Sequence, residues 1–462
     1  MKKNAHLTFV VAMTLVCSLL TSCATNSYDN FSFPEKEDSV LVKVADYSRK
    51  TDYDNDAPYD PTVTTVSSSD GLCVMEVKEH YFDITLDLEK GDHYSVGKAY
   101  GEVLRMVAGD CFSSMESYLY ENARYFFNNV DDSTYEELGK RTASLYSSLP
   151  KDYQDEIRGL SEMVTDSKGF VEDGVLSYDE MILAQFIPDA LRGSACSAVS
   201  LDGERTESGK RITSRLLEWP TGTKSQVANM HAVVHYIHGE SSFVSVGVLG
   251  VLTPFSLMSS HGVVIGMLDV GSDDTAFTCE NKASYTFGMR YAIENTTTAR
   301  EASEYMAEHA YEYTYCANIF VTDEKDAFCV EMPVTPENGK PIIRSKETPI
   351  FSTLPNTAEN CIYVVNGFVC EGHKDIVTYK LGNRIRWERF DSWFTGNMKF
   401  SLETFKEIMT CENTERAMQV VGNNDSAFHW VIADYDTRTI QASFTVADPK
   451  GDAPVLYTVA QF

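Results

Sequence analysis

The chain has 462 residues, which is enough for one large domain or for two to three ordinary ones. Its hydrophobic content of 43% and aromatic content of 11% are typical of a folded protein and argue against a disordered one. The 68 acidic residues outnumber the 39 basic residues, and the net charge of −29 argues against binding to nucleic acid or adhesion to anionic lipid.

The N-terminus has the pattern of an export signal. Lys2 and Lys3 precede an apolar run over residues 7–20, which is too short to span a bilayer and has the length of a secretory signal core. The run ends in the letters LTSC, which resemble a bacterial lipobox, where the cysteine is lipidated. The sequence therefore predicts a lipoprotein signal peptide over residues 1–22, lipidation at Cys23, and a lipid anchor to the membrane of the bacterial cell envelope. An ordinary signal peptide with an incidental cysteine is the alternative.

A tether and then a folded segment follow the signal. Residues 23–75 are rich in Asp, Ser, Asn, Thr and Pro without clear periodicity, so we expect an acidic flexible tether. Residues 80–86 alternate as a strand and lead into a predicted helix that contains Gly97 and Gly101. Two glycines four residues apart lie on one helical face and allow close packing against a neighbour.

The next hundred residues predict helices. The letters STYE at residues 133–136 and SYDE at residues 177–180 are capping boxes, and a further helix is expected over residues 152–163. Pro188 is expected to end the helix that starts at the second box. We therefore predict a mainly helical segment over residues 76–195, which the family resemblance given below implies is a pro-segment.

Beyond residue 196 the pattern changes to strands. Strands are expected over residues 197–201, 211–217, 227–237, 242–248, 263–268, 317–321 and 327–332, and residues 430–434 are expected to pair with 439–446. Helices are expected after Thr296 and over residues 402–409. Alternating helical and strand-rich blocks predict an α+β fold, a four-layer αββα sandwich of two stacked sheets with helices outside.

Two short motifs carry the candidate chemistry. The letters GSACSAV at residues 193–199 place Cys196 behind a turn of small residues, and the letters RLLEW follow at residues 215–219. This pattern resembles the N-terminal nucleophile (Ntn) hydrolases of the choloylglycine hydrolase and penicillin acyltransferase superfamily. The resemblance covers roughly residues 80–445 and implies a catalytic chain over residues 196–462 in an Ntn-hydrolase sandwich.

The resemblance also implies self-cleavage between Ala195 and Cys196. One residue then carries both a thiol nucleophile and a new α-amine, whose pKa of about 7.7 to 8 suits a general base near neutral pH. The two chains, α over residues 76–195 and β over residues 196–462, are expected to remain associated. No cofactor is implied.

Four further site residues follow from local matches to the same superfamily. Arg215 is expected beside the sulfur, where a cation favours the thiolate, and Glu218 is expected to hold the α-amine in place of the usual aspartate. Ser259 stands where asparagine is common, and Asn366 is expected to donate to the tetrahedral oxyanion. Arg384 is expected to be a second site arginine, from the letters GNRIR at residues 382–386.

Three histidines, His231, His235 and His238, also invite a metal site. They lie in a predicted strand, which places His238 on the opposite face from the other two, so we predict no metal.

Two classes of function remain open. The first is an amidohydrolase or acyltransferase that acts on a linear C–N amide, such as an N-acylated amino acid, a bile-salt conjugate or a β-lactam precursor. The second is a ligand-binding lipoprotein that retains the fold without catalysis, in which Ser259 and Glu218 mark the loss of activity.

Overall fold

The structure is a computed structural model that describes residues 65–107, 109–127, 130–165, 167–191, 195–270, 279–374, 377, 381–410, 427–445 and 454–462. All of these residues belong to one compact unit, Lys36–Phe462, and the other unit, Met1–Glu35, lies outside them. The predicted signal peptide, the lipidation site Cys23 and most of the predicted tether also lie outside the described residues. Within the described part, no helix is both long and apolar enough to cross a membrane.

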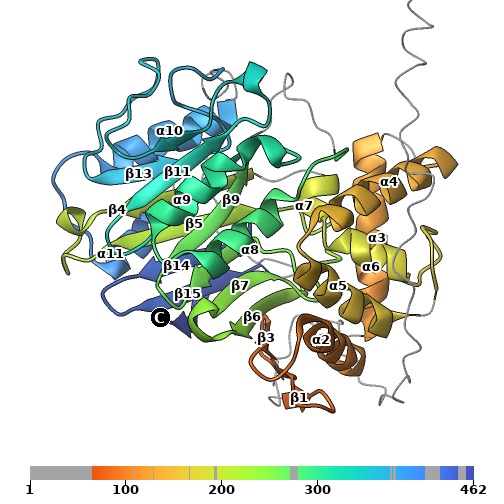
Figure 1. Cartoon of the computed structure of the whole chain (residues 1–462). Helices are drawn as coiled ribbons and strands as arrows, with labels where there is room; N and C mark the ends of the chain where they lie inside the picture. Colours follow the sequence, from red (N-terminus) through yellow and green to blue (C-terminus); the bar gives the residue numbers. More distant parts are fainter. Residues whose placement is uncertain are drawn as a thin grey trace, which may run out of the picture. The chain divides into compact units, whose positions relative to one another are not determined.

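The larger sheet has ten strands in the order β1-β2-β3-β6-β7-β8-β9-β10-β11-β12 (Figure 1). Neighbouring strands are antiparallel except β3 and β6, which run parallel. The strands are β1 (Thr65–Ser67), β2 (Cys73–Val77), β3 (Phe82–Asp87), β6 (His231–Ile237), β7 (Phe243–Val248), β8 (Ser256–Ser259), β9 (Val264–Asp269), β10 (Ala317–Thr322), β11 (Ala327–Met332) and β12 (Ile342–Arg344).

The pairing of β3 with β6 joins the N-terminal part of the chain to the sheet of the C-terminal part. Phe82 of β3 lies opposite Ala232 of β6, and the register continues to Asp87 and Ile237. The described residues begin with β1, which lies before the predicted end of the tether at residue 75. A three-residue edge strand with two exposed residues has no hydrophobic alternation, and for that reason the sequence pattern did not reveal it.

The smaller sheet has six strands in the order β13-β4-β5-β14-β15-β16. These strands are β4 (Ala195–Leu201), β5 (Ile212–Glu218), β13 (Cys361–Val364), β14 (Ala427–Asp434), β15 (Thr439–Phe444) and β16 (Tyr457–Gln461). The predicted hairpin near the C-terminus is confirmed, because Asp434 pairs with Thr439 in an antiparallel register.

The two sheets stack face to face. Val246 and Val264 of the larger sheet pack in one core with Val431 and Ala442 of the smaller sheet. On β9, Met267 is an odd number of residues from Val264 and therefore points the other way, where its sulfur accepts a hydrogen bond from Tyr285 of a covering helix.

Helices cover both outer faces. Helices α8 (Tyr285–Asn295) and α9 (Ala299–Glu308) pack on the larger sheet, and α10 (Leu381–Phe394) packs on β13 of the smaller sheet, with α11 (Leu402–Met409) beside it (Figure 1). The layers therefore follow the order helix, sheet, sheet, helix, and the predicted αββα sandwich is confirmed.

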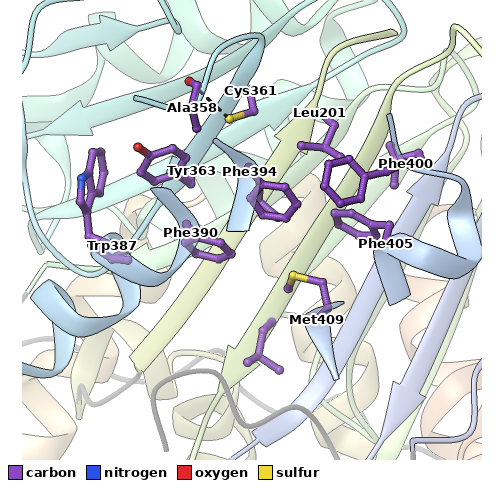
Figure 2. Packing of buried hydrophobic residues seen from close by; sticks show 14 of the residues in the cluster. Leu201, Ala358, Cys361, Tyr363, Trp387, Phe390, Phe394, Phe400, Phe405 and Met409 are labelled. Carbon is purple, nitrogen blue, oxygen red and sulfur yellow. Dashed lines mark hydrogen bonds between the residues drawn. The ribbon is translucent and has the colours of Figure 1, made fainter. Parts of the chain in front are cut away.

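An aromatic cluster attaches α10 and α11 to the smaller sheet. Phe390 and Phe394 of α10 and Phe405 of α11 pack near Leu201 of β4, as Figure 2 shows. Each side chain of this kind contributes about 1.5–3 kcal/mol when it is fully buried. This packing fixes which face of α10 points toward β4.

The segment between β3 and β4 is helical in its described residues. Its helices are α2 (His93–Val107), α3 (Gly109–Phe127), α4 (Asp132–Ser148), α5 (Lys151–Val164), α6 (Tyr178–Ala184) and α7 (Ile187–Ala190). The capping box that begins at Ser177 is confirmed. Helix α4 is instead capped by Asp131, whose carboxylate accepts from the N–H groups of Ser133 and Thr134. Pro188 does not end α6 but lies in the first turn of α7, where its missing N–H costs nothing.

The predicted close approach at Gly97 and Gly101 occurs between α2 and α5. A Cβ atom on Gly97 would lie 2.0 Å from the carbonyl oxygen of Glu156, and one on Gly101 would lie 2.5 Å from Cβ of Met163. Only glycine allows the two backbones to approach so closely.

Two elements near the site were not predicted. Helix α8 contains Tyr285, Thr286, Phe287 and Gly288, which are weak helix formers, so its sequence does not indicate a helix. Strand β8 has only four residues and is buried throughout, so it shows no polar alternation.

Candidate active site

Cys196 is the second residue of β4, and the register with β5 fixes its direction. Cys196 lies opposite Leu217, and Ala198 lies opposite Arg215. Because side chains alternate along a strand, Cys196 and Arg215 point to the same face. The thiol is completely buried, and its sulfur accepts a hydrogen bond of 3.6 Å from Nη2 of Arg215. The structure therefore places the Arg215 guanidinium beside the Cys196 sulfur, as the sequence predicts.

The Arg215 guanidinium is buried among uncharged acceptors. Nη2 donates to the carbonyl oxygen of Met267 at 2.7 Å, and Nη1 lies 3.1 Å from Nε2 of His429. Burial lowers the pKa of Arg215, and the neighbouring Cys196 and Asp269 raise it. A buried cation stabilises an anion that forms beside it. The Cys196 sulfur contacts this guanidinium and can become that anion as a thiolate.

His429 accepts the Arg215 hydrogen bond as a neutral imidazole. Burial lowers its pKa well below the usual range, and Arg215 and His231 lower it further. Nε2 also lies 2.9 Å from Oγ of Ser256. Neither His429 nor Ser256 was predicted as a site residue, because a histidine in a hydrophobic strand and a serine between two apolar residues have no distinctive spacing.

Glycine lets the larger sheet approach Arg215. A Cβ atom on Gly266 of β9 would lie 2.9 Å from Cγ of Arg215, closer than side chains tolerate. The absence of a side chain at this position therefore makes room for the guanidinium between the sheets.

Asn366 holds the amide nitrogen of Cys196. The backbone N–H of Cys196 donates to Oδ1 of Asn366 at 2.6 Å, and Nδ2 of Asn366 donates to the carbonyl oxygen of Asp269 at 2.7 Å. These partners determine the orientation of the carboxamide, since its oxygen faces donors and its nitrogen faces an acceptor. One N–H of Nδ2 is committed to Asp269, which leaves the second for the predicted oxyanion contact.

Arg386, rather than the predicted Arg384, is the second arginine that lies beside Cys196 and Asn366. Arg386 is buried, and its guanidinium donates to the carbonyl oxygen of Cys196, to Oγ of Ser197 at 3.0 Å and to Oδ1 of Asn366 at 3.1 Å. Arg384 is exposed and pairs with Glu388 one turn further along α10. The two arginines are two residues apart on a helix and therefore point in different directions, and the aromatic packing of α10 decides which one faces β4.

Glu218 pairs with Arg386 at 3.0 Å. Burial raises the pKa of Glu218, and the Arg386 charge opposes that rise. Since Glu218 is three residues from Arg215 on β5, it points away from the thiol and toward α10. Glu218 therefore contacts the arginine that binds Asn366, and its contact with an α-amine of Cys196 stays a prediction.

Ser259 is the last residue of β8, directly before the turn to β9. Its Oγ accepts from the N–H of Val263 at 3.2 Å, and its carbonyl oxygen accepts from the N–H of Gly262 at 3.0 Å. Three residues along a strand span about 10 Å, so Ser259 is displaced from Ser256, which contacts His429. The structure does not bring Ser259 together with the cluster, because the short strand β8 places the motif at the far end of its hairpin.

Ala195 is the first residue of β4 and lies opposite Glu218. The predicted cleavage bond between Ala195 and Cys196 therefore lies at the very start of a strand. Gly193 and Ser194 lie outside the described residues.

Tyr285 of α8 and Asp269 at the end of β9 form a further contact next to Asn366. The Tyr285 hydroxyl donates to Oδ1 of Asp269 at 2.8 Å. Burial raises the pKa of Tyr285 well above its usual range, and the charge of Asp269 contributes to that rise. Sequence reasoning missed both residues, because α8 was not predicted and a strand-terminal aspartate has no special signal.

The described residues contain no group of three or more His, Cys, Asp or Glu side chains that is arranged to hold a metal ion. Of the three histidines considered from the sequence, His231 lies 2.9 Å from the carbonyl oxygen of Thr445, and His235 pairs with Asp83 at 3.1 Å.

Comparisons with known proteins give matches in structure alone. No protein-family model matches the chain, and no curated protein matches its sequence. Among solved structures, the N-acylethanolamine-hydrolyzing acid amidase ortholog of Caenorhabditis elegans matches with a TM-score of 0.36 and 10% identity, over 51% of this chain and 92% of that chain. Penicillin V acylase from Agrobacterium tumefaciens matches with a TM-score of 0.33 and 12% identity, over 54% and 83%.

A conjugated bile acid hydrolase from Clostridium perfringens also matches, with a TM-score of 0.32 and 11% identity, over 57% of this chain and 96% of that chain. All of these TM-scores lie below 0.5, so the fold assignment rests on the two stacked sheets and their helical layers. The chain is similar to a solved amidase, a solved acylase and a solved bile acid hydrolase, and the resemblance of its motifs around Cys196 to the Ntn hydrolases rests on the sequence.

Proposed function

We propose that the chain is an exported lipoprotein that cleaves a linear C–N amide bond, with Cys196 as a nucleophile exposed by self-cleavage. The observation that carries this proposal is the arrangement at the start of β4. The Cys196 sulfur lies 3.6 Å from Arg215, and the nitrogen of the same residue is held at 2.6 Å by Asn366. A cation at the sulfur favours attack, and an acceptor at the nitrogen suits an amide that becomes an amine.

Self-cleavage proceeds through an acyl shift. The Cys196 sulfur attacks the carbonyl carbon of Ala195, an S–C bond forms, the C–N bond breaks, and the nitrogen takes up the thiol proton. Water then hydrolyses the thioester, which yields a carboxylate on Ala195 and a thiol and an α-amine on Cys196. The C-terminal chain has 462 − 195 = 267 residues.

Turnover uses the same groups. The α-amine accepts the thiol proton while the sulfur attacks the substrate carbonyl, and it returns that proton to the leaving amine. Oδ1 of Asn366 holds the α-amine, and the second N–H of Nδ2 stabilises the oxyanion. Arg386 holds the carboxamide oxygen, and Glu218 balances the charge of Arg386.

The acyl thioester then reacts with water or with a second amine, which makes the protein a hydrolase or an acyltransferase. Suitable substrates are small N-acyl amides, such as an N-acylated amino acid, a bile-salt conjugate or a β-lactam precursor. The proposed steps use only groups of the chain, the substrate and water.

We also propose that both chains stay together after cleavage and that Cys23 carries the lipid. The pairing of β3 with β6 supports the first proposal, because the strands of the α chain are part of a sheet of the β chain. The ion pair between Glu156 of α5 and Arg290 of α8, at 2.7 Å and fully buried, supports it further.

The alternative is a ligand-binding lipoprotein that retains the fold. The observation that favours it is the position of Ser259, which is displaced from the thiol and does not contribute an oxyanion donor from the expected motif.

Denaturing gels and intact-mass spectra of purified protein test the proposal. We expect two chains for the wild type, with the larger one starting at Cys196, and a single chain for Cys196→Ala. The two-chain form should hydrolyse members of a panel of N-acyl amides, and Cys196→Ala should not. A single full-length chain in the wild type, without hydrolysis of any panel member, would support the binding protein instead.

A further inference from the structure

Asp189 of α7 is a buried carboxylate six residues before Ala195 in the chain. It is completely buried and accepts four hydrogen bonds. The donors are the N–H of Tyr285 at 3.0 Å and the hydroxyls of Ser284 at 2.7 Å, Thr286 at 2.9 Å and Thr314 at 2.9 Å. All four donors lie on the C-terminal side of the cleavage bond, and Asp189 lies on the N-terminal side.

Hydrogen bonds and three intervening residues connect this carboxylate to the nitrogen of the cleavage bond. Tyr285 donates its backbone N–H to Asp189 and its hydroxyl to Oδ1 of Asp269, the latter at 2.8 Å. The Asp269 carbonyl oxygen accepts from Nδ2 of Asn366 at 2.7 Å, and Oδ1 of Asn366 accepts from the N–H of Cys196 at 2.6 Å. The last helix before the cleavage bond is thus tied to the same support that holds Cys196.

Burial of the charged Asp189 carboxylate is energetically unfavourable. Burial raises the pKa of Asp189 to about 6, although the hydroxyl and amide donors lower it. None of the four donors is a cation, so charging this group in the interior is unfavourable near neutral pH. Four donors that converge on one carboxylate offset part of that cost and hold α7 in a single position relative to α8.

We propose that Asp189 is a positioning residue for self-cleavage, in which its carboxylate clamps the end of the pro-segment onto the start of α8. The clamp holds the Ala195 carbonyl within reach of the Cys196 sulfur while the chain through Tyr285, Asp269 and Asn366 holds the nitrogen. This inference rests on the proposed self-cleavage at Cys196. After cleavage, the same contact joins the two chains.

The test follows the conversion of full-length precursor, made by cell-free translation, into two chains on denaturing gels. Asp189→Ala removes all four hydrogen bonds and should slow conversion by about 10- to 100-fold, the usual scale for misplaced reacting groups. Asp189→Asn should remain within about threefold of the wild type, because the Ser284 and Thr286 hydroxyls can turn to accept from the new amide.

A matched control comes from another buried aspartate of the pro-segment. Asp179 accepts from the N–H of Gly169, so its contact does not cross the cleavage bond. Asp179→Ala should therefore convert at the wild-type rate. Folding is checked by thermal unfolding of each variant combined with Cys196→Ala, which cannot cleave.

A second variant keeps the test decisive if Asp189→Ala fails to fold. Tyr285→Phe leaves the clamp intact and removes only the hydroxyl that supports Asp269, and it should slow conversion by about tenfold.

The outcomes separate the two proposals. A wild-type precursor that never converts overturns the self-cleavage itself. A wild type that converts, together with a folded Asp189→Ala that converts equally fast, overturns only the role of Asp189. Asp189→Asn as slow as Asp189→Ala would also overturn it, since positioning by hydrogen bonds predicts rescue. A Tyr285→Phe that converts as fast as the wild type overturns the proposed link from Asp189 through Asp269 to Asn366.

Discussion

The backbone N–H of Cys196 donates a hydrogen bond of 2.6 Å to Oδ1 of Asn366, a residue 170 positions later in the chain. The carboxamide is held from the other side by its own bond to the Asp269 carbonyl oxygen. An acceptor at this nitrogen is compatible with the amide before cleavage and with the amine after it, because both carry an N–H. One side chain therefore supports both the proposed maturation and the proposed turnover.

Asn366→Ala should slow both reactions. Loss of the carboxamide removes the acceptor at the Cys196 nitrogen and one oxyanion donor, and loss of such a donor typically costs about 100- to 1000-fold in rate. We expect a lower kcat with KM nearly unchanged in hydrolysis of an N-acyl amide, measured on whatever two-chain protein forms. Wild-type kcat in this variant would remove Asn366 from the mechanism.

Arg215→Gln should make Cys196 less reactive. A cation near 4 Å stabilises a thiolate by about 4 kcal/mol at an effective dielectric constant near 20, so alkylation at neutral pH should slow by tenfold or more. The measurement is iodoacetamide labelling of the two-chain protein across a pH series, read by mass spectrometry at Cys196.

Arg211→Gln is the control for the Arg215 variant. Arg211 is a buried arginine just before β5, and it pairs with Asp202 at 2.7 Å. Its replacement should leave the alkylation profile unchanged. Identical profiles for Arg215→Gln and the wild type would show that the guanidinium does not activate the sulfur.

Arg386→Gln and Arg384→Gln form a matched pair on α10. Arg386→Gln leaves Glu218 buried without its partner, which should lower the free energy of unfolding by about 3–5 kcal/mol and slow self-cleavage. Arg384→Gln removes an exposed pair with Glu388 and should change that free energy by less than about 1 kcal/mol. Urea unfolding of both variants in a Cys196→Ala background measures the difference, and equal losses would contradict the assignment of Arg386.

The contact between Glu156 and Arg290 predicts loss of stability in acid. Burial raises the pKa of Glu156, but Arg290 and His93 outweigh it and bring that pKa to about 2. Because the folded pKa lies below the unfolded value of 4.5, the stabilisation is complete above pH 4.5 and is lost as pH falls toward 2. It amounts to roughly 3 kcal/mol.

Thermal unfolding between pH 6 and pH 2 checks this prediction. Glu156→Gln should be less stable than the wild type at pH 6, and the gap should close toward pH 2. A gap that stays constant over this range would show that the ionisation of Glu156 does not contribute. The same series on the two-chain form should show the chains separating more easily in acid, since Glu156 and Arg290 lie on opposite sides of the cleavage bond.

Cys23→Ala should release the protein from the membrane. The LTSC motif predicts that the wild type enters the detergent phase in phase partitioning, and the variant should enter the aqueous phase. Equal partitioning of both proteins into the aqueous phase would contradict a lipid anchor at Cys23.

The sequence by itself determined the features that depend on neighbouring residues. Alternating hydrophobicity located β4, β5 and most strands of both sheets, and capping residues located α6 through Ser177. The spacing of nineteen residues between Cys196 and Arg215 spans one hairpin, so the two strands pair and bring the two side chains to one face. Local patterns of this kind are set by backbone geometry that repeats along the chain.

Only the tertiary structure decided which distant groups complete the site. Arg384 and Arg386 are equivalent in sequence, and the packing of Phe390 and Phe394 turns Arg386 toward Cys196. Ser259 matches a family motif, yet the short strand β8 carries it to the far end of a hairpin. The support by Asp189 and Tyr285 depends on a helix whose residues have little intrinsic preference for helix, and which forms because its apolar face is buried against the larger sheet.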